Sequence, residues 1–112
     1  MGKKISIAKL ITVDADTEED VVIYTVDEAT KFKTKSVYLA FPASTFGELE
    51  VSIFRGIQKI APYRGVYVGD NNVIEDEFIE DISSAERVIV HVKNTNTSEA
   101  RQVFVIVRGE LE

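Results

Sequence analysis

Apolar and polar residues alternate along much of this chain, with the two-residue period of a β-strand that buries one face. The two clearest runs cover residues 86–94 and 101–108, separated by the polar segment 95–100. One face of these runs is made of valines: Val88, Val90, Val92, Val103, Val105 and Val107. Two such runs around a short polar loop predict an antiparallel hairpin that stops at Gly109.

Four further strands are predicted at residues 4–13, 21–26, 31–41 and 48–55. The acidic stretch 14–20 is predicted to be a loop, and the Gly-Asp-Asn-Asn sequence at 69–72 to be a turn. Residues 57–61 fit either a short strand or a single helical turn, and a short strand is considered at 66–68.

Residues 73–82 leave two alternatives open. Ile74, Phe78, Ile79 and Ile82 fit helical spacing, whereas a strand would bring two carboxylates, Asp76 and Glu80, to the same face as Ile74, Phe78 and Ile82. A strand therefore buries carboxylates on the face of the isoleucines, unless a bulge interrupts it. Extended structure is favoured, because the neighbouring segments are predicted strands and turn signals flank this one.

Seven to nine strands in 112 residues indicate one all-β domain over residues 1–112. Short strands with frequent turns are typical of a two-sheet sandwich or a closed barrel, and we expect an antiparallel, jelly-roll-like β-sandwich. Valine and isoleucine far outnumber leucine, and branching at Cβ favours strands over helices.

The charge and the cysteine count exclude several classes of function. The formal net charge is −6, and an acidic chain is repelled by phosphate backbones, so no nucleic-acid partner is expected. The lysines at 3–4 and 31–35 are predicted to be solvated strand ends and edges. No cysteine is present, which excludes disulfides and thiol catalysis, and no apolar run is long enough to cross a membrane.

Catalytic chemistry is not indicated, and the chain is predicted not to be an enzyme. His91 is the only histidine, and the alternation predicts that it shares a solvent-facing strand surface with Arg87 and Lys93. No serine stands in a Gly-x-Ser-x-Gly sequence, so no nucleophile is identified beside a base. One histidine and no cysteine cannot supply a typical zinc site, and no metal or other cofactor is expected.

A ligand-binding site is the alternative. Tyr63 and Tyr67 could form an aromatic platform for a sugar, and Asp70 and Asn72 belong to a run of oxygen donors that suit calcium. The run lacks the donor spacing of an EF-hand loop. These four residues are predicted to lie together near one end of the sandwich.

The second faces of the two valine-rich strands are partly apolar. Ile89 and His91 lie there on one strand, and Phe104 and Ile106 on the next. A strand that is apolar on both faces is covered by another layer or meets a partner chain. If the two strands form a hairpin, these four residues make one patch with a basic rim, which predicts a contact between copies of the chain.

The order of strands and turns resembles that of small jelly-roll proteins that tailed phages and archaeal viruses build into heads, fibres or decoration. The resemblance covers residues 20–109 and includes three stretches: Val21-Val-Ile-Tyr-Thr-Val26, Leu49-Glu-Val-Ser-Ile-Phe-Arg-Gly56 and Gln102-Val-Phe-Val-Ile-Val-Arg-Gly109. It rests on strand rhythm and has no catalytic residues to carry over. It implies homo-oligomers, often trimers, with other virion proteins as further partners.

Two functions follow as expectations. The first is a non-enzymatic structural or interaction protein that oligomerises and belongs to a virion, which would then be its location; otherwise a cytoplasmic location is expected. The second is a carbohydrate- or calcium-dependent ligand-binding module.

Overall fold

The computed structural model describes residues 2–112, and Met1, the first residue of the predicted domain, lies outside the described residues. Residues 2–112 form nine strands and no helix, and therefore no helix that could cross a membrane. The strands are β1 (Lys3–Val13), β2 (Glu18–Thr25), β3 (Phe32–Phe41), β4 (Leu49–Arg55), β5 (Gln58–Ala61), β6 (Asn72–Glu77), β7 (Asp81–Ile82), β8 (Arg87–Asn94) and β9 (Arg101–Leu111).

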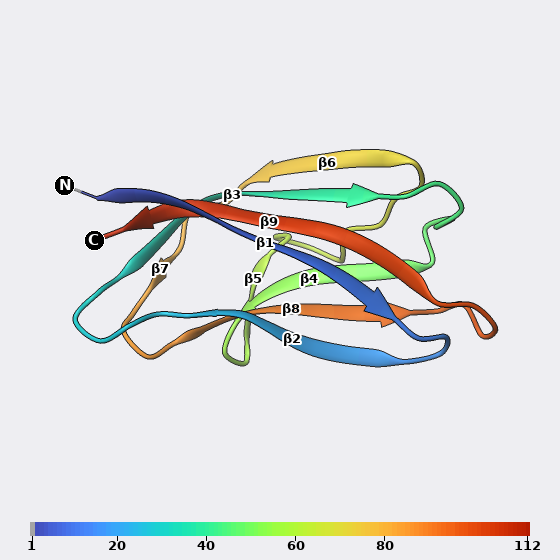
Figure 1. The fold of residues 1–112 in the computed structure, drawn as a ribbon, viewed down its shortest axis with the longest axis horizontal. Coiled ribbons are helices and arrows are strands. Elements are labelled where there is room, and N and C mark those ends of the chain that lie inside the picture. The colour runs from blue at the N-terminus through green and yellow to red at the C-terminus, as the bar shows by residue number, and fades with distance from the viewer. Residues whose placement is uncertain (1) are drawn as a thin grey trace.

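The strands form two antiparallel sheets that face each other (Figure 1). Sheet A has the order β1-β9-β3-β6, with the two-residue β7 also paired to β3, and sheet B has the order β2-β8-β4-β5. The pairs β1–β9, β2–β8, β3–β6 and β4–β5 are nested along the chain, as in one long ribbon rolled into a sandwich. This is jelly-roll topology, and the predicted all-β sandwich is confirmed.

The core lies between the sheets and is built from the valine faces that the alternation predicts. Val88, Val90 and Val92 of β8 face Val103, Val105 and Val107 of β9, and all six are fully buried. Each contributes roughly 1.5–3 kcal/mol by leaving water. The other large buried side chains include Phe32, Leu39, Leu49, Ile53 and Ile82.

The predicted hairpin between residues 86–94 and 101–108 is wrong. β8 is a central strand of sheet B and β9 is a central strand of sheet A, so the two face each other across the core and do not pair. Alternation along each strand identifies which residues are buried, but it carries no information about which strand lies alongside. Pairing here is decided by the connection between the two strands.

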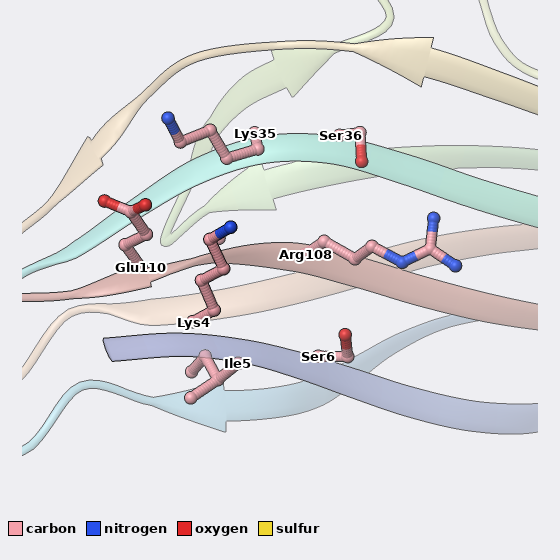
Figure 2. A pocket seen from close by; sticks show the side chains of 8 residues that line it. Lys4, Ile5, Ser6, Lys35, Ser36, Arg108 and Glu110 are labelled. Carbon is pink, nitrogen blue, oxygen red and sulfur yellow. The ribbon is translucent and has the colours of Figure 1, made fainter. Parts of the chain in front are cut away.

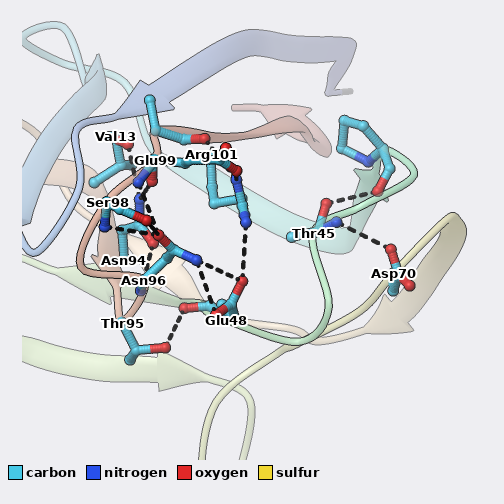
Figure 3. A network of polar contacts seen from close by, with 12 residues as sticks. Val13, Thr45, Glu48, Asp70, Asn94, Thr95, Asn96, Ser98, Glu99 and Arg101 are labelled. Atoms are coloured by element: carbon cyan, nitrogen blue, oxygen red, sulfur yellow. Dashed lines mark hydrogen bonds and ion pairs between the residues drawn. The ribbon is translucent and has the colours of Figure 1, made fainter.

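That connection is organised by two asparagines (Figure 3). The Asn94 side chain is buried, and its amide nitrogen donates to the carbonyl oxygens of Val13, Asp14 and Glu99 at 3.1, 3.3 and 3.0 Å. Its oxygen accepts the backbone N–H of Asn96 at 2.9 Å. Asn94 therefore ties the end of β8 to the end of β1 and directs the chain from sheet B into sheet A.

Asn96 and Arg101 complete the same loop from the other side. The Asn96 side-chain oxygen accepts the backbone N–H groups of Ser98 and Glu99, both at 2.8 Å. Its amide nitrogen and the Arg101 guanidinium both donate to the carboxylate of Glu48, which precedes β4. The loop is thus closed by Asn96 and held to the start of β4 through Glu48, while the buried Arg101 Nε has no hydrogen-bond partner among residues 2–112.

Two strand boundaries differ from the prediction. The strand expected at 21–26 begins at Glu18, inside the stretch predicted as a loop, because Glu18 and Asp20 bind His91 on the next strand. Strand β9 runs through Gly109 to Leu111, since the ring of Phe32 occupies the space where a Cβ of residue 109 would stand. At residue 109 glycine therefore serves close packing and does not end the strand.

The ambiguous segments are extended. Residues 58–61 form β5, Tyr67 makes a single β-bridge to Val51, and residues 73–82 are divided between β6 and β7. The two carboxylates that a strand was expected to bury are only half-buried, and both have partners. Asp76 accepts a hydrogen bond from the Tyr67 hydroxyl at 2.6 Å, and Glu80 accepts one from Arg55 at 3.3 Å.

We expect Asn94→Ala to lower the free energy of unfolding by about 2 kcal/mol, because it leaves buried carbonyl groups without a donor. Chemical denaturation followed by fluorescence or circular dichroism would measure the change. Thr97→Ala, an exposed substitution in the same loop, is the control and should change stability little. Equal effects of the two substitutions would contradict a special role for Asn94.

Candidate functional site

The outer face of sheet A carries an apolar row that crosses all four of its long strands. The strand register aligns Leu10 of β1 with Phe104 of β9, Phe104 with Ala40 of β3, and Ala40 with Val73 of β6. Leu10, Phe104 and Val73 are 56%, 36% and 52% exposed. Period-two alternation turns these residues away from the core, so no part of residues 2–112 covers them.

The row borders a shallow hollow and a second, mixed row. The hollow measures about 290 Å³ and is lined by Leu10, Phe104 and Val73 together with Pro42 and neighbouring residues of the β3–β4 and β5–β6 connections. The next row along the strands places Ala8 beside Ile106, and Ile106 beside Tyr38. We refer to the residues Leu10, Ala40, Val73, Phe104 and Ile106 as the apolar face.

The four predicted interface residues do not form one patch. Phe104 and Ile106 belong to the apolar face of sheet A, whereas Ile89 and His91 lie on the outer face of sheet B, on the opposite side of the sandwich. The separation follows from the wrong hairpin, which would have brought both pairs to one side. Whether either pair forms a contact between copies stays a prediction.

Beyond the apolar face, sheet A holds a basic hollow of about 450 Å³ (Figure 2). Its lining consists of Lys4, Ile5, Ser6, Lys35, Ser36, Arg108, Gly109 and Glu110. Ser6 and Ser36 flank Arg108 in the strand register, so two hydroxyls and a guanidinium lie in one row across β1, β9 and β3. Three cations and one carboxylate give this hollow a net positive charge in a chain whose net charge is −6.

Of the three cations, only Arg108 has a carboxylate and an aromatic ring beside it in the described part of the chain. Arg108 lies 3.7 Å from the Glu75 carboxylate and 5.6 Å from the centre of the Tyr38 ring. Lys4 and Lys35 are exposed, and no carboxylate of residues 2–112 lies within ion-pair distance of their ammonium groups. Sequence reasoning missed this site, because the three cations are far apart in sequence and only the pairing of β1, β9 and β3 brings them together.

His91 lies between two carboxylates on the outer face of sheet B. Its Nδ1 is 2.6 Å from Asp20 Oδ1, and its Nε2 is 2.6 Å from Glu18 Oε2. The ring of Phe54 on β4 packs beside it, with 5.8 Å between the two ring centroids. Partial burial lowers the pKa of His91, but the hydrogen bonds to Asp20 and Glu18 outweigh it, so the pKa lies above its ordinary value of 6.5. The protonated ring therefore ties the edge strand β2 to β8.

This arrangement does not resemble a nucleophile with its general base. Both ring nitrogens of His91 are occupied by carboxylates, so neither is directed at a nucleophile. Ser52 lies opposite His91 in the register of β4 and β8, but it is buried and makes no hydrogen bond to the ring among residues 2–112. The predicted surface with Arg87 and Lys93 omitted the two carboxylates, which β2 contributes from 71 and 73 residues away.

Of the four residues of the alternative ligand site, three make hydrogen bonds within the fold and the fourth, Tyr63, is exposed. The Tyr67 hydroxyl is bonded to Asp76, and burial together with this hydrogen bond raises the pKa of Tyr67. Asp70 accepts the backbone N–H of Thr45, and Asn72 accepts the backbone N–H of Asp70. Tyr63 is almost fully exposed.

No group of three or more histidine, cysteine, aspartate or glutamate side chains among residues 2–112 is suitably placed to hold a metal ion. Among three hollows of the described surface, two lie on sheet A and one lies beside the β3–β4 connection. Of the residues Tyr63, Tyr67, Asp70 and Asn72, only Asn72 lines any of these hollows. The alternative hypothesis therefore lacks an assembled site at these residues.

Known proteins are similar to this chain in fold but not in sequence. No protein-family model matches the chain, and no curated protein matches it in sequence. In structure it is similar to a chain of Bacillus endospore appendages, described as a novel family of disulfide-linked pili, with a TM-score of 0.51 and 14% identity over 98% of this chain and 90% of that one. It is also similar to a chain from the structure of tomato aspermy virus, with a TM-score of 0.58 and 15% identity over 97% and 76%.

We expect the contribution of His91 to stability to depend on pH. Because folding raises the pKa of His91, its contribution is full below pH 6.5 and is lost as the pH rises through the raised value. The difference in free energy of unfolding between the wild-type chain and His91→Gln should therefore shrink as the pH rises from 6 to 9, about the range in which histidine titrates.

Chemical denaturation at a series of pH values would measure this difference. Asp20→Asn is a matched variant, because it removes one of the two charged partners and should reduce the pH dependence while keeping the imidazole. A difference that is constant over the range, or that grows with pH, would contradict the proposed ion pairs.

Proposed function

We propose that this chain is a non-enzymatic structural subunit that assembles with copies of itself through the apolar face of sheet A. The observation that carries the proposal is the register-aligned row of Leu10, Phe104, Ala40 and Val73, which is exposed across the full width of the sheet. Contiguous apolar patches rimmed by polar residues are typical of protein contacts. A second copy that lies on the row shields these apolar side chains from water, and Arg108 and Glu75 form part of the polar rim of the contact.

The edges of the two sheets favour contact through a face. Lys9 shares the core-facing side of β1 with Ile7 and Ile11, and a charge in that position discourages another strand from adding to the edge. Carboxylates crowd the edge strands β2 and β6, and β5 has only four residues. With the edges protected in this way, the outer face of sheet A is the surface best suited to association.

The structural similarities support the same class of function. The two similar chains come from a pilus and a virus, and both structures share the sandwich fold with this chain. The pili are described as disulfide-linked, whereas the 112 residues of this chain contain no cysteine. Assembly of this chain would therefore rely on non-covalent contacts.

A more specific form of the proposal makes the assembly part of a virus particle, with trimers as the unit and other virion proteins as neighbours. The shared fold with a chain of tomato aspermy virus supports it. The particle would then be the location of the chain. Mass spectrometry of purified virus particles would test this form, and particles without the chain would leave only the general proposal.

We expect Leu10→Lys and Val73→Lys each to weaken self-association about tenfold or more, equivalent to 1.4 kcal/mol or above, because each introduces a charge into the contact. Both residues are more than half exposed on edge strands, so the monomer should fold normally. Sedimentation velocity and light scattering over a range of concentrations would measure the association.

Ile57→Lys is the matched control, because Ile57 is fully exposed in the β4–β5 turn, outside the apolar face. Its association should equal that of the wild-type chain. A wild-type chain that stays monomeric at high micromolar concentration would overturn the proposal. An Ile57→Lys variant whose self-association is weakened as much as that of Leu10→Lys would also overturn it.

A further inference from the structure

We infer that the basic hollow of sheet A receives the acidic β1–β2 turn of a neighbouring copy, which makes the self-association head-to-tail. This inference rests on the proposed function and adds the partner segment and the direction of the contact. The acidic turn is defined here as residues 14–20, which contain five carboxylates and no cation. The hollow has the opposite charge, through Lys4, Lys35 and Arg108.

The two sites cannot meet within one chain. Strand β1 runs between them, with Lys4 near its start and Asp14 directly after its end. Ten residues of extended strand separate them by about 33 Å. The strand is paired to β9 along its whole length, so it cannot bend to close this gap. Figure 1 shows the two ends of β1 at opposite ends of the long axis of the molecule, which measures 46 Å.

Hydrogen bonds hold the acidic turn in one conformation, and three of its carboxylates are free to bind a partner. The Asp16 backbone N–H donates to the carbonyl of Asn96 at 2.8 Å, and the Thr17 hydroxyl donates to the carbonyl of Asp14 at 2.7 Å. Glu18 and Asp20 are engaged with His91, which leaves Asp14, Asp16 and Glu19 exposed. A turn that is already ordered loses little conformational entropy when it binds.

The hollow is suited to such a segment in size and chemistry. Its volume of about 450 Å³ and its open mouth suit a short peptide turn. Figure 2 shows Lys4 extending from β1 towards β9 and Lys35 extending from β3 on the other side of β9, with the Ser6 and Ser36 hydroxyls between the strands. The ammonium groups pair with carboxylates and the hydroxyls donate to their remaining lone pairs. Glu110 at the rim opposes any further acidic group and so limits how the turn can enter.

A contact between different surfaces of two copies has a consequence for symmetry. Each copy keeps one free hollow and one free acidic turn, so addition continues until the chain of copies closes into a ring or extends as a filament. A closed ring of three copies would be a trimer. Along β1, Leu10 of the apolar face lies between Lys4 of the hollow and Asp14 of the acidic turn, so a copy bound at the hollow also lies near this face.

A charge swap tests the inference. Lys4→Glu with Lys35→Glu reverses the charge of the hollow. Asp14→Lys with Glu19→Lys reverses the summed charge of the three carboxylates of the turn that do not bind His91, and leaves the partners of His91 intact. Each double variant should associate about tenfold more weakly than the wild-type chain, and the quadruple variant should recover the wild-type association, because both surfaces are reversed together. Association of the wild-type chain should also weaken as salt is added.

Lys9→Glu with Lys31→Glu is the matched control, with the same change in charge outside the hollow. Sedimentation velocity on all variants gives the readout. If the quadruple variant does not recover, the hollow receives something other than the acidic turn and the inference is overturned. If reversal of the hollow has no effect while Leu10→Lys still abolishes assembly, the inference fails and the proposed function stands; a monomeric wild-type chain overturns both.

Discussion

The fold depends on the buried side chain of Asn94. Its amide nitrogen donates to three carbonyl oxygens and its oxygen accepts one N–H, and these bonds join the ends of β8 and β1 with the loop that follows β8. Asn94 ends β8 in sheet B, and its amide bonds to Val13 of sheet A and to the loop that follows β8. The chain therefore leaves sheet B at this residue and enters sheet A at Arg101. The central strand of each sheet is thereby placed opposite the other, and the six-valine core follows from that placement.

The sequence contained the burial pattern but not the pairing. Alternation identified Val88, Val90 and Val92 as core residues, because a strand turns every second side chain to the same face. It could not show that residues 95–100 form a crossing, since that depends on hydrogen bonds from Asn94 to Val13 and Asp14, about eighty residues earlier. For the same reason the interface prediction was only partly correct. Phe104 does lie on an outward face, that of sheet A, but Ile89, which was predicted to lie beside it, is on the outer face of sheet B.

Sites made of distant residues were the hardest to foresee. His91 was predicted to face solvent beside two cations, and its carboxylate partners come from β2, which lies next to it only through the rolled topology. Lys4, Lys35 and Arg108 belong to three strands whose order in sheet A is β1, β9, β3, which a linear reading does not reveal. Local features fared better: the half-buried carboxylate of Asp76 was expected from the strand pattern, and Tyr67 is its partner.

The two strands at the centre of the sandwich are also the last two long strands of the chain. Strands β1 and β3 have no pairing with each other until β9 lies between them, and β2 and β4 likewise wait for β8. On a ribosome, the segments before β8 would therefore emerge as strands with open edges and an uncovered apolar side, and the sandwich could close only after β8 and β9 have emerged. Such late, long-range pairing is slow and exposes the nascent chain to aggregation. The charges on β1, β2 and β6 would then protect the chain during synthesis as well as after folding.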